Sequence, residues 1–153
     1  LNLIYRPHPA DIYNPLLKKN VENILKSFNS NNKFYLDDNP SYLESYSRSK
    51  FLITDFSGTA YTYSFSTLKP VIFYSHNDLD LLKNDNFKDL YFFKDRYRIG
   101  KVIKNLNDLQ ENLNFDFDKV KKEILNLRNL RIKYFANSNQ KSLLSIKEIL
   151  NRQ

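Results

Sequence analysis

The chain has 153 residues, of which 41% are hydrophobic and 27% are charged. This length and composition are typical of a single globular domain and argue against a largely disordered chain. No apolar run approaches the roughly 20 residues of a membrane-spanning helix, and the lack of cysteine excludes disulfides and thiolate metal sites. The formal net charge of +7 comes from lysines dispersed among asparagines and acids, which favours a solvated surface over a nucleic-acid-binding face.

The first part of the chain alternates between short apolar runs and an amphipathic segment. Leu1–Tyr5 predicts a strand, and apolar residues at helical spacing predict a helix from about Asp11 to Phe28. After a polar loop, Lys33–Leu36 is expected to form a second strand, Ser41–Ser47 a short helix and Phe51–Ile53 a third strand.

The rest of the chain begins with a helix and a strand and then becomes less regular. Thr59–Ser66 is predicted to be helical and Val71–Tyr74 to form a fourth strand, while Tyr91–Phe93 and Lys101–Ile103 have the composition of short edge strands. Two more helices are expected around residues 120–130 and 143–150. Strands that alternate with helices in this way predict a parallel, Rossmann-like sheet between layers of helices, that is, a three-layer α/β sandwich.

Polar residues follow each predicted strand at its carboxyl end. In an open parallel sheet, ligands bind outside these ends, because the loops and the first turns of the helices open there. We therefore expect a candidate site at this edge of the sheet, and both histidines of the chain fall on it. In chain order the edge carries Arg6 and His8, then residues 37–39, then Thr54, Asp55, Ser57, Gly58 and Thr59, and finally residues 75–78.

The turn with the sequence DFSGT contains Gly58, one of only two glycines in the chain. A glycine at the start of a helix lets a ligand approach the backbone, and the free N–H groups and dipole of the helix favour an anion such as a phosphate. The hydroxyl groups of Ser57 and Thr59 would add hydrogen bonds to such a ligand. The alternative is that Asp55 or Ser57 is only a helix N-cap, worth about 1 kcal/mol to the fold.

His8 lies between Pro7 and Pro9, which restrict the backbone on both sides of it. A histidine held in this way is suited to donate a hydrogen bond to a phosphate or to transfer a proton. The alternative is a loop histidine that is bonded to a backbone carbonyl. No group of residues has the spacing of a metal site, and the P-loop and nucleophile-elbow motifs are absent.

Two segments, RPHP and LITDFSGTAYTYSFSTLKPVIFY, together resemble the CDP-glycerol glycerophosphotransferases, which make teichoic-acid-like polymers of the cell envelope. The resemblance covers roughly Ile4 to Asp78 and points to the C-terminal, nucleotide-binding half of that family. It implies a GT-B architecture, in which two Rossmann-like domains enclose the active site. Because the sequence also lacks methionine, even at position 1, we expect residues 1–153 to be a single donor-binding domain excised from a longer protein.

The resemblance also implies roles for individual residues. His8 matches the family histidine that acts in catalysis or in binding the donor phosphate, and Arg6 stands beside it in the same motif. The turn residues that match the contacts to the donor pyrophosphate are Thr54, Asp55, Ser57 and Gly58. The family has a second serine where this chain has Gly58, so that one hydroxyl is replaced by a bare backbone amide.

The implied reaction moves a polyol phosphate from CDP-glycerol or a similar nucleotide-linked donor to a hydroxyl of a polymer acceptor. It needs the missing N-terminal GT-B domain and no cofactor, metal or nucleic acid, so the isolated domain is expected to be inactive. The expected location is the cytoplasm, with peripheral association of the full-length protein at the inner face of the bacterial plasma membrane. Two alternatives stay open: another GT-B transferase that uses a nucleotide sugar, and a polyanion-binding module, in keeping with the +7 charge and 15% aromatic content.

Overall fold

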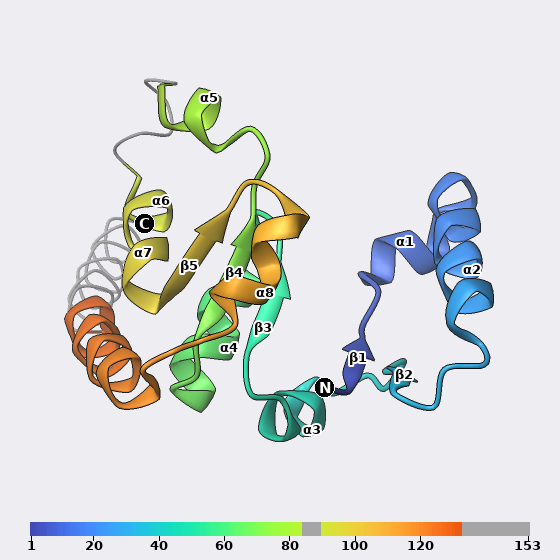
Figure 1. The fold of residues 1–153 in the computed structure, drawn as a ribbon, viewed down its shortest axis with the longest axis horizontal. Helices are drawn as coiled ribbons and strands as arrows, with labels where there is room; N and C mark the ends of the chain where they lie inside the picture. Colours follow the sequence, from blue (N-terminus) through green and yellow to red (C-terminus); the bar gives the residue numbers. More distant parts are fainter. Residues whose placement is uncertain (84–89, 133–153) are drawn as a thin grey trace, which may run out of the picture. The chain divides into compact units, whose positions relative to one another are not determined.

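The computed structural model describes residues 1–83 and 90–132. The chain divides into two compact units, Leu1–Ser49 and Lys50–Gln153, each described here by itself. The described strands form a two-stranded sheet, β1–β2, in the first unit and a three-stranded sheet, β3–β4–β5, in the second, and all pairs are parallel (Figure 1). The predicted α/β class with a parallel, Rossmann-like arrangement is confirmed, with its strands distributed over two sheets.

The first unit builds its sheet from two short strands. Its elements are β1 (Leu3–Tyr5), α1 (Pro9–Tyr13), α2 (Pro15–Phe28), β2 (Phe34–Leu36) and α3 (Leu43–Arg48). Leu3 pairs with Phe34 and Tyr5 with Leu36, so both strands end at the same edge. The predicted strands and the short helix after them are thereby confirmed within one or two residues.

The single helix expected from Asp11 to Phe28 is wrong, because the segment forms two helices that meet at Asn14. Pro15 disfavours helical backbone in the residue before it, and Asn14 is extended, with φ −82° and ψ 116°. The Asn14 N–H donates to the carbonyl of Ala10 and ends α1, while its side chain accepts from the Leu16 N–H at 3.0 Å and begins α2. One asparagine therefore ends one helix and caps the next.

The second unit has β4 at the centre of its sheet. Val71, Ile72 and Phe73 of this strand are fully buried, as expected for a strand covered on both faces. The elements of this unit are β3 (Leu52–Thr54), α4 (Thr59–Thr67), β4 (Val71–Tyr74), α5 (Asp78–Lys83), α6 (Tyr91–Lys94), α7 (Arg96–Ile99), β5 (Gly100–Ile103), the 3-10 helix η1 (Leu106–Asp108), α8 (Leu109–Asn112) and a helix over residues 117–132.

Helices on both sides of the sheet complete the core of the second unit. Helix α4 packs against β3, and α8 packs against β5. The 117–132 helix lies beside α4, because Arg128 donates to the Phe65 carbonyl at 2.9 Å, and it buries Ile124 and Leu127 completely. Figure 1 shows the arrowheads of β3, β4 and β5 pointing the same way, so the residues after β3 and β4 emerge at one edge.

Two of the later predictions differ from the structure or lie beyond it. Tyr91–Phe93, expected to be an edge strand, forms the short helix α6, in which Phe93 is buried and its ring lies 4.2 Å from that of Phe56. A short run of aromatic residues fits a strand and a buried helical turn equally well, and packing decides between them. The strand at Lys101–Ile103 and the helix around residues 120–130 are confirmed. The helix expected at 143–150 lies outside the described residues.

Gly100, at the start of β5, is required by close packing of the backbone. A Cβ atom at this position would overlap the carbonyl oxygen of Val71 and lie 2.6 Å from its carbonyl carbon. Gly100 pairs with Val71 in the parallel ladder, and its extended φ of 177° can be adopted by any residue. The requirement at this position is therefore space and not backbone conformation.

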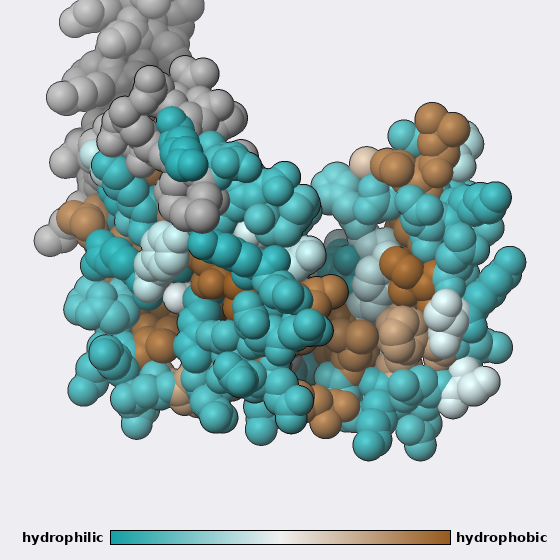
Figure 2. Space-filling view, turned by 45° about the horizontal axis from the view of Figure 1, so that its top comes forward, coloured by the Kyte–Doolittle hydropathy of each residue, from teal (hydrophilic) through white to brown (hydrophobic). Residues whose placement is uncertain are grey.

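The first unit buries few apolar side chains of its own. Among the described residues, Val21 and Tyr46 are its buried hydrophobic side chains, whereas Tyr13 and Leu16 at the α1–α2 junction are 83% and 85% exposed. Figure 2 shows apolar patches set among hydrophilic ones on the face in view. No helix among the described residues is long and apolar enough to cross a membrane.

Candidate functional site

Arg6 of the first unit is held by an internal ion pair. Its Nη1 lies 2.7 Å from Asp37 Oδ2, so the residues after β1 and β2 meet across the edge of the sheet. The guanidinium also donates to the carbonyls of Pro40 and Ser41, each at 3.4 Å. Arg6, expected to bind substrate, therefore already makes an ion pair and hydrogen bonds within its own unit. Its side chain is 30% exposed.

The carboxylate of Asp37 is stabilised in its charged form. Burial alone would raise the pKa of Asp37, but hydrogen bonds from Ser45 and Arg6, together with the backbone N–H of Asn39, outweigh it and lower the pKa. Asp37 thus ties β2, α3 and the Arg6 side chain together. Its role in the structure is to fix the loop edge of the first unit.

His8 is the N-cap of α1. Its Nδ1 accepts a hydrogen bond from the Ala10 N–H at 3.1 Å, and its carbonyl accepts from the Asp11 N–H at 2.9 Å. A ring nitrogen that accepts a hydrogen bond carries no proton, so the N–H donor of this imidazole is Nε2. His8 is exposed. The side chain therefore accepts from the backbone, instead of donating to a carbonyl, and it presents an N–H donor to the solvent.

In the second unit, the DFSGT turn begins α4 directly after β3. Thr54 is the last residue of β3 and is half-buried, while Asp55, Gly58 and Thr59 are exposed. Ser57 Oγ accepts from the Thr59 N–H at 3.3 Å, and the Ser57 carbonyl accepts from Ala60. Neither of the two candidate caps is the N-cap of α4, which is Gly58; the Ser57 hydroxyl instead accepts from the first helical N–H, one residue before the cap position. Its hydroxyl hydrogen stays available to a ligand.

Gly58 is the N-cap residue of α4, but neither its backbone conformation nor packing requires a glycine there. Its φ of −60° and ψ of −23° are ordinary helical values, and an added Cβ atom would meet nothing within 4 Å. Within the described part of the chain, its N–H donates no hydrogen bond. A bare, unpaired amide therefore lies at the positive end of the nine-residue helix α4, which is the arrangement that anions favour.

Two of the residues after β4, Ser75 and Asp78, make bonds within the second unit. Ser75 is mostly buried, and its N–H donates to the Ile103 carbonyl at 2.9 Å. His76 is exposed, and its ring lies 6.3 Å from that of Tyr74. Asp78 is buried in an ion pair with Arg96. Sequence reasoning missed this pair, because Arg96 stands in the charged run KDRYR, which has the pattern of a solvated surface.

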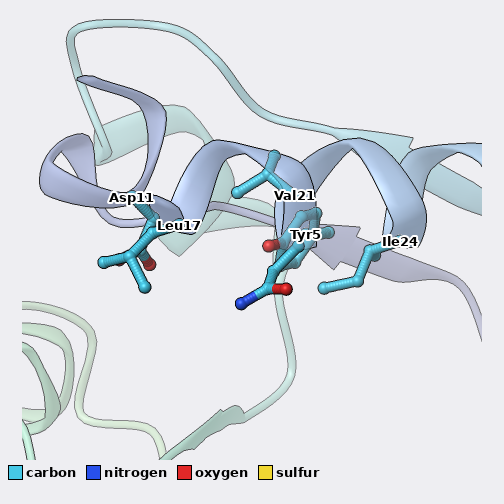
Figure 3. Close-up of a pocket in the computed structure, with 6 residues that line it drawn as sticks. Tyr5, Asp11, Leu17, Val21 and Ile24 are labelled. Atoms are coloured by element: carbon cyan, nitrogen blue, oxygen red, sulfur yellow. The ribbon is translucent and has the colours of Figure 1, made fainter. Parts of the chain in front are cut away.

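A small open pocket of about 220 Å³ lies in the first unit (Figure 3). Leu17, Val21 and Ile24 of α2 form its apolar wall, while Tyr5 at the end of β1 and Asp11 of α1 add polar groups. Burial raises the pKa of the Tyr5 phenol, and the nearby charge of Asp11 raises it further. Tyr5 therefore stays a neutral hydrogen-bond donor at physiological pH.

The described residues hold no cluster of metal-ligating side chains. The family model CDP-Glycerol:Poly(glycerophosphate) glycerophosphotransferase matches residues 1–150. The chain belongs to this family. The match spans both units, so the resemblance seen in the two motifs is confirmed over nearly the whole chain. Searches of curated proteins and of solved structures found no match.

Membership in the glycerophosphotransferase family places the chain among transferases of the cell-envelope polymer type. The family acts with a nucleotide-linked donor and a polymer acceptor, as its description states. The two motifs lie in different units, and the structure describes each within its own unit. The ligand contacts expected of Arg6, His8 and the turn residues therefore stay predictions.

Proposed function

We propose that this chain is the donor-binding domain of a glycerophosphotransferase-like enzyme. In the proposed reaction, the oxygen of an acceptor hydroxyl attacks the phosphorus next to the polyol of a CDP-linked donor. The new P–O bond forms as the bond to the CMP oxygen breaks, and CMP leaves with the electron pair. A base from the N-terminal GT-B domain of the full-length protein takes the hydroxyl proton, and no metal ion is assigned a role.

The observation that carries the proposal is the free amide of Gly58. It is exposed at the start of α4, has no hydrogen-bond partner among the described residues and has no side chain to keep a phosphate away. Ser57 adds a hydroxyl donor next to it, and the dipole of α4 adds partial positive charge. Together these groups suit the negative charge of a diphosphate, which grows on the leaving phosphate in the transition state.

His8 is proposed to be the catalytic donor to the same diphosphate. Because Nδ1 is occupied by the Ala10 N–H, the Nε2–H is the group that faces outward and donates. A donor of this kind stabilises the negative charge that grows on the leaving CMP. Thr54, Asp55 and Thr59 complete the proposed donor contacts, and Arg6 adds positive charge through the part of its guanidinium that Asp37 leaves exposed.

The proposal is tested by calorimetric titration of the 153-residue chain with CDP, UDP and CMP. We expect CDP to bind better than CMP, because the second phosphate adds a contact to the turn, and better than UDP. A preference for UDP would favour a nucleotide-sugar donor instead. Binding that appears only with polyanions and falls steeply with salt would favour the polyanion-binding alternative.

A His8→Asn variant separates the two roles of the histidine. Asparagine keeps a side-chain acceptor for the N-cap of α1 but has no Nε2–H. We expect an unchanged melting temperature and weaker binding of CDP than in the wild-type chain. Absence of CDP binding to the wild-type chain at millimolar concentration would refute the proposed function.

A further inference from the structure

Asp78 and Arg96 form a buried ion pair in the second unit. Each side chain is 1% exposed, and Arg96 Nη2 lies 2.7 Å from Asp78 Oδ1, although these two atoms do not meet the geometry of a hydrogen bond. Tyr97 donates to Asp78 Oδ2 at 3.0 Å, and Arg96 Nε donates to the Phe93 carbonyl at 3.3 Å. Burying two charges is costly, and apolar residues of similar size often stabilise such a position equally well. Stability alone is therefore a weak reason for this pair.

Aromatic rings surround the Arg96 guanidinium. Its central carbon lies 4.8 Å from the ring centroid of Phe93, 5.8 Å from those of Phe73 and Tyr97, and 5.9 Å from that of Phe56. Such distances allow cation–π attraction, which is strongest for desolvated cations. The guanidinium is thus held in place by an ion pair on one side and by rings on the others.

Phe56 connects this cluster to the proposed donor-binding turn. It stands between Asp55 and Ser57 in the sequence, and its ring contacts those of Phe92 and Phe93 at centroid distances of 4.8 and 4.2 Å. Asp78 follows β4, whereas the turn follows β3, and these two strands are neighbours in the sheet. The buried cluster therefore ties together two adjacent loops at the carboxyl edge.

We propose that Arg96, held by Asp78, is a positioning residue for donor binding. It fixes the ring of Phe56, and through it the Ser57 hydroxyl and the Gly58 amide, before the donor arrives. Groups that are already ordered lose less entropy on binding and stabilise developing charge more effectively. This inference rests on the proposed function, because it concerns the same turn. Arg96 itself does not touch the donor.

The test replaces the ion pair by apolar residues in an Asp78→Leu/Arg96→Met double variant, so that no unpaired charge is left in the core. We expect the variant to fold, to bind CDP about tenfold more weakly and to exchange the amide hydrogens of Thr59 and Ala60, which donate to Ser57, faster in the free state. The matched control is Asp95→Leu/Arg131→Met, which removes another Asp–Arg pair, with a 2.6 Å contact and side chains 8% and 14% exposed, for which no interaction with Phe56 is found among the described residues. Its CDP affinity should equal that of the wild-type chain.

A second variant guards against failure of the first to fold. Phe56→Leu keeps the ion pair but removes the ring that rests on Arg96, and it changes a side chain that is 42% exposed. We expect the same tenfold loss of CDP affinity. Wild-type affinity and wild-type amide exchange in either folded variant would overturn the inference. If the wild-type chain does not bind CDP, the proposed function fails, whereas the exchange of the Thr59 and Ala60 amides still tests the positioning.

Discussion

At the level of single residues, the two glycines of the chain differ in the space around them. Gly100 has no room for a Cβ atom, whereas Gly58 has open space around it and an ordinary helical backbone. Packing therefore explains the first glycine, and the approach of a ligand is the explanation that we propose for the second. This contrast leads to two linked predictions.

Gly58→Ala should separate stability from binding. Gly58 is the N-cap of α4, a position that favours glycine over alanine, but its backbone is helical and the methyl group meets nothing within 4 Å, so the free energy of unfolding should change by less than about 1 kcal/mol. The new methyl group would occupy the space that a phosphate needs, and the affinity for CDP should fall about tenfold, which corresponds to about 1.4 kcal/mol. Urea unfolding and calorimetry measure the two quantities. A variant that binds CDP as tightly as the wild-type chain would contradict the assignment of Gly58.

Gly100→Ala should give the opposite pattern at the other glycine. The methyl group would overlap the Val71 carbonyl and push β5 away from β4, at a cost of roughly 1–3 kcal/mol or more. The expected result is a lower urea midpoint for the second unit. CDP affinity, measured under conditions in which the variant is folded, should change little. An unchanged midpoint would show that β5 can shift without cost.

The carboxyl group of Asp37 predicts how the first unit responds to acid. Its pKa is lowered in the folded chain from the usual value of 3.8, so its contribution to stability is present above that value and is lost as the pH falls through the folded pKa. The free energy of unfolding of the first unit should therefore fall below about pH 4. Asp37→Asn should reduce this dependence, whereas Asp38→Asn, at an exposed neighbour, should not. Equal acid sensitivity in both variants would be evidence against the Arg6–Asp37 pair.

At the level of elements, helix caps allow a matched test of the turn. The Ser57 hydroxyl accepts from the Thr59 N–H at the start of α4, and the side chain of Asn14, the N-cap of α2, accepts from the Leu16 N–H. Replacing either residue by alanine should cost about 1 kcal/mol of stability. Only Ser57→Ala should also weaken CDP binding in titrations of the two variants. If Asn14→Ala weakens CDP binding to the same extent, the effect of Ser57 is one of folding and not of contact.

Most helices and strands could be predicted from the sequence, because the spacing of apolar residues indicates the type of element and the glycines, prolines and small polar residues indicate where it ends. Gly58 and Ser57 mark the start of α4, and the run VIFY marks the central strand. The failures have local causes. Pro15 divides a helix whose apolar spacing is continuous, and the aromatic residues of α6 fit a strand until the ring of Phe56 is placed against them. Which neighbour a ring packs against is tertiary information that apolar periodicity does not contain.

At the level of the whole molecule, the two units differ in the size of their cores. Among the described residues, the first unit buries Val21 and Tyr46, whereas the second buries ten hydrophobic residues, including the whole centre of β4. Small domains that bury few side chains are marginally stable. Hydrogen exchange should therefore show amides of β1 and β2 opening at lower free energy than those of β4. Equal protection in both units would mean that they unfold as one.

The sequence motifs of the candidate site could be predicted, but the ion pairs that hold its residues in place could not. The order of RPHP and DFSGT along the chain identified the family, and the chemistry of His8, Ser57 and Gly58 follows from their residue types. The support beneath the turn was hidden, because a buried arginine such as Arg96 looks like any surface charge in a sequence. The ion pair of Arg6 with Asp37 was hidden for the same reason, since partners 31 residues apart carry no local signal.

The central claim is that the Gly58 amide and the His8 imidazole bind the diphosphate of one donor. It is tested most directly by NMR titration of the isotope-labelled 153-residue chain with CDP. The account predicts that the Gly58 N–H and the His8 ring signals shift together and saturate at the same CDP concentration, with a smaller shift for Ser57. Binding that leaves Gly58 and His8 unmoved, or two shifts that saturate at different concentrations, would contradict it.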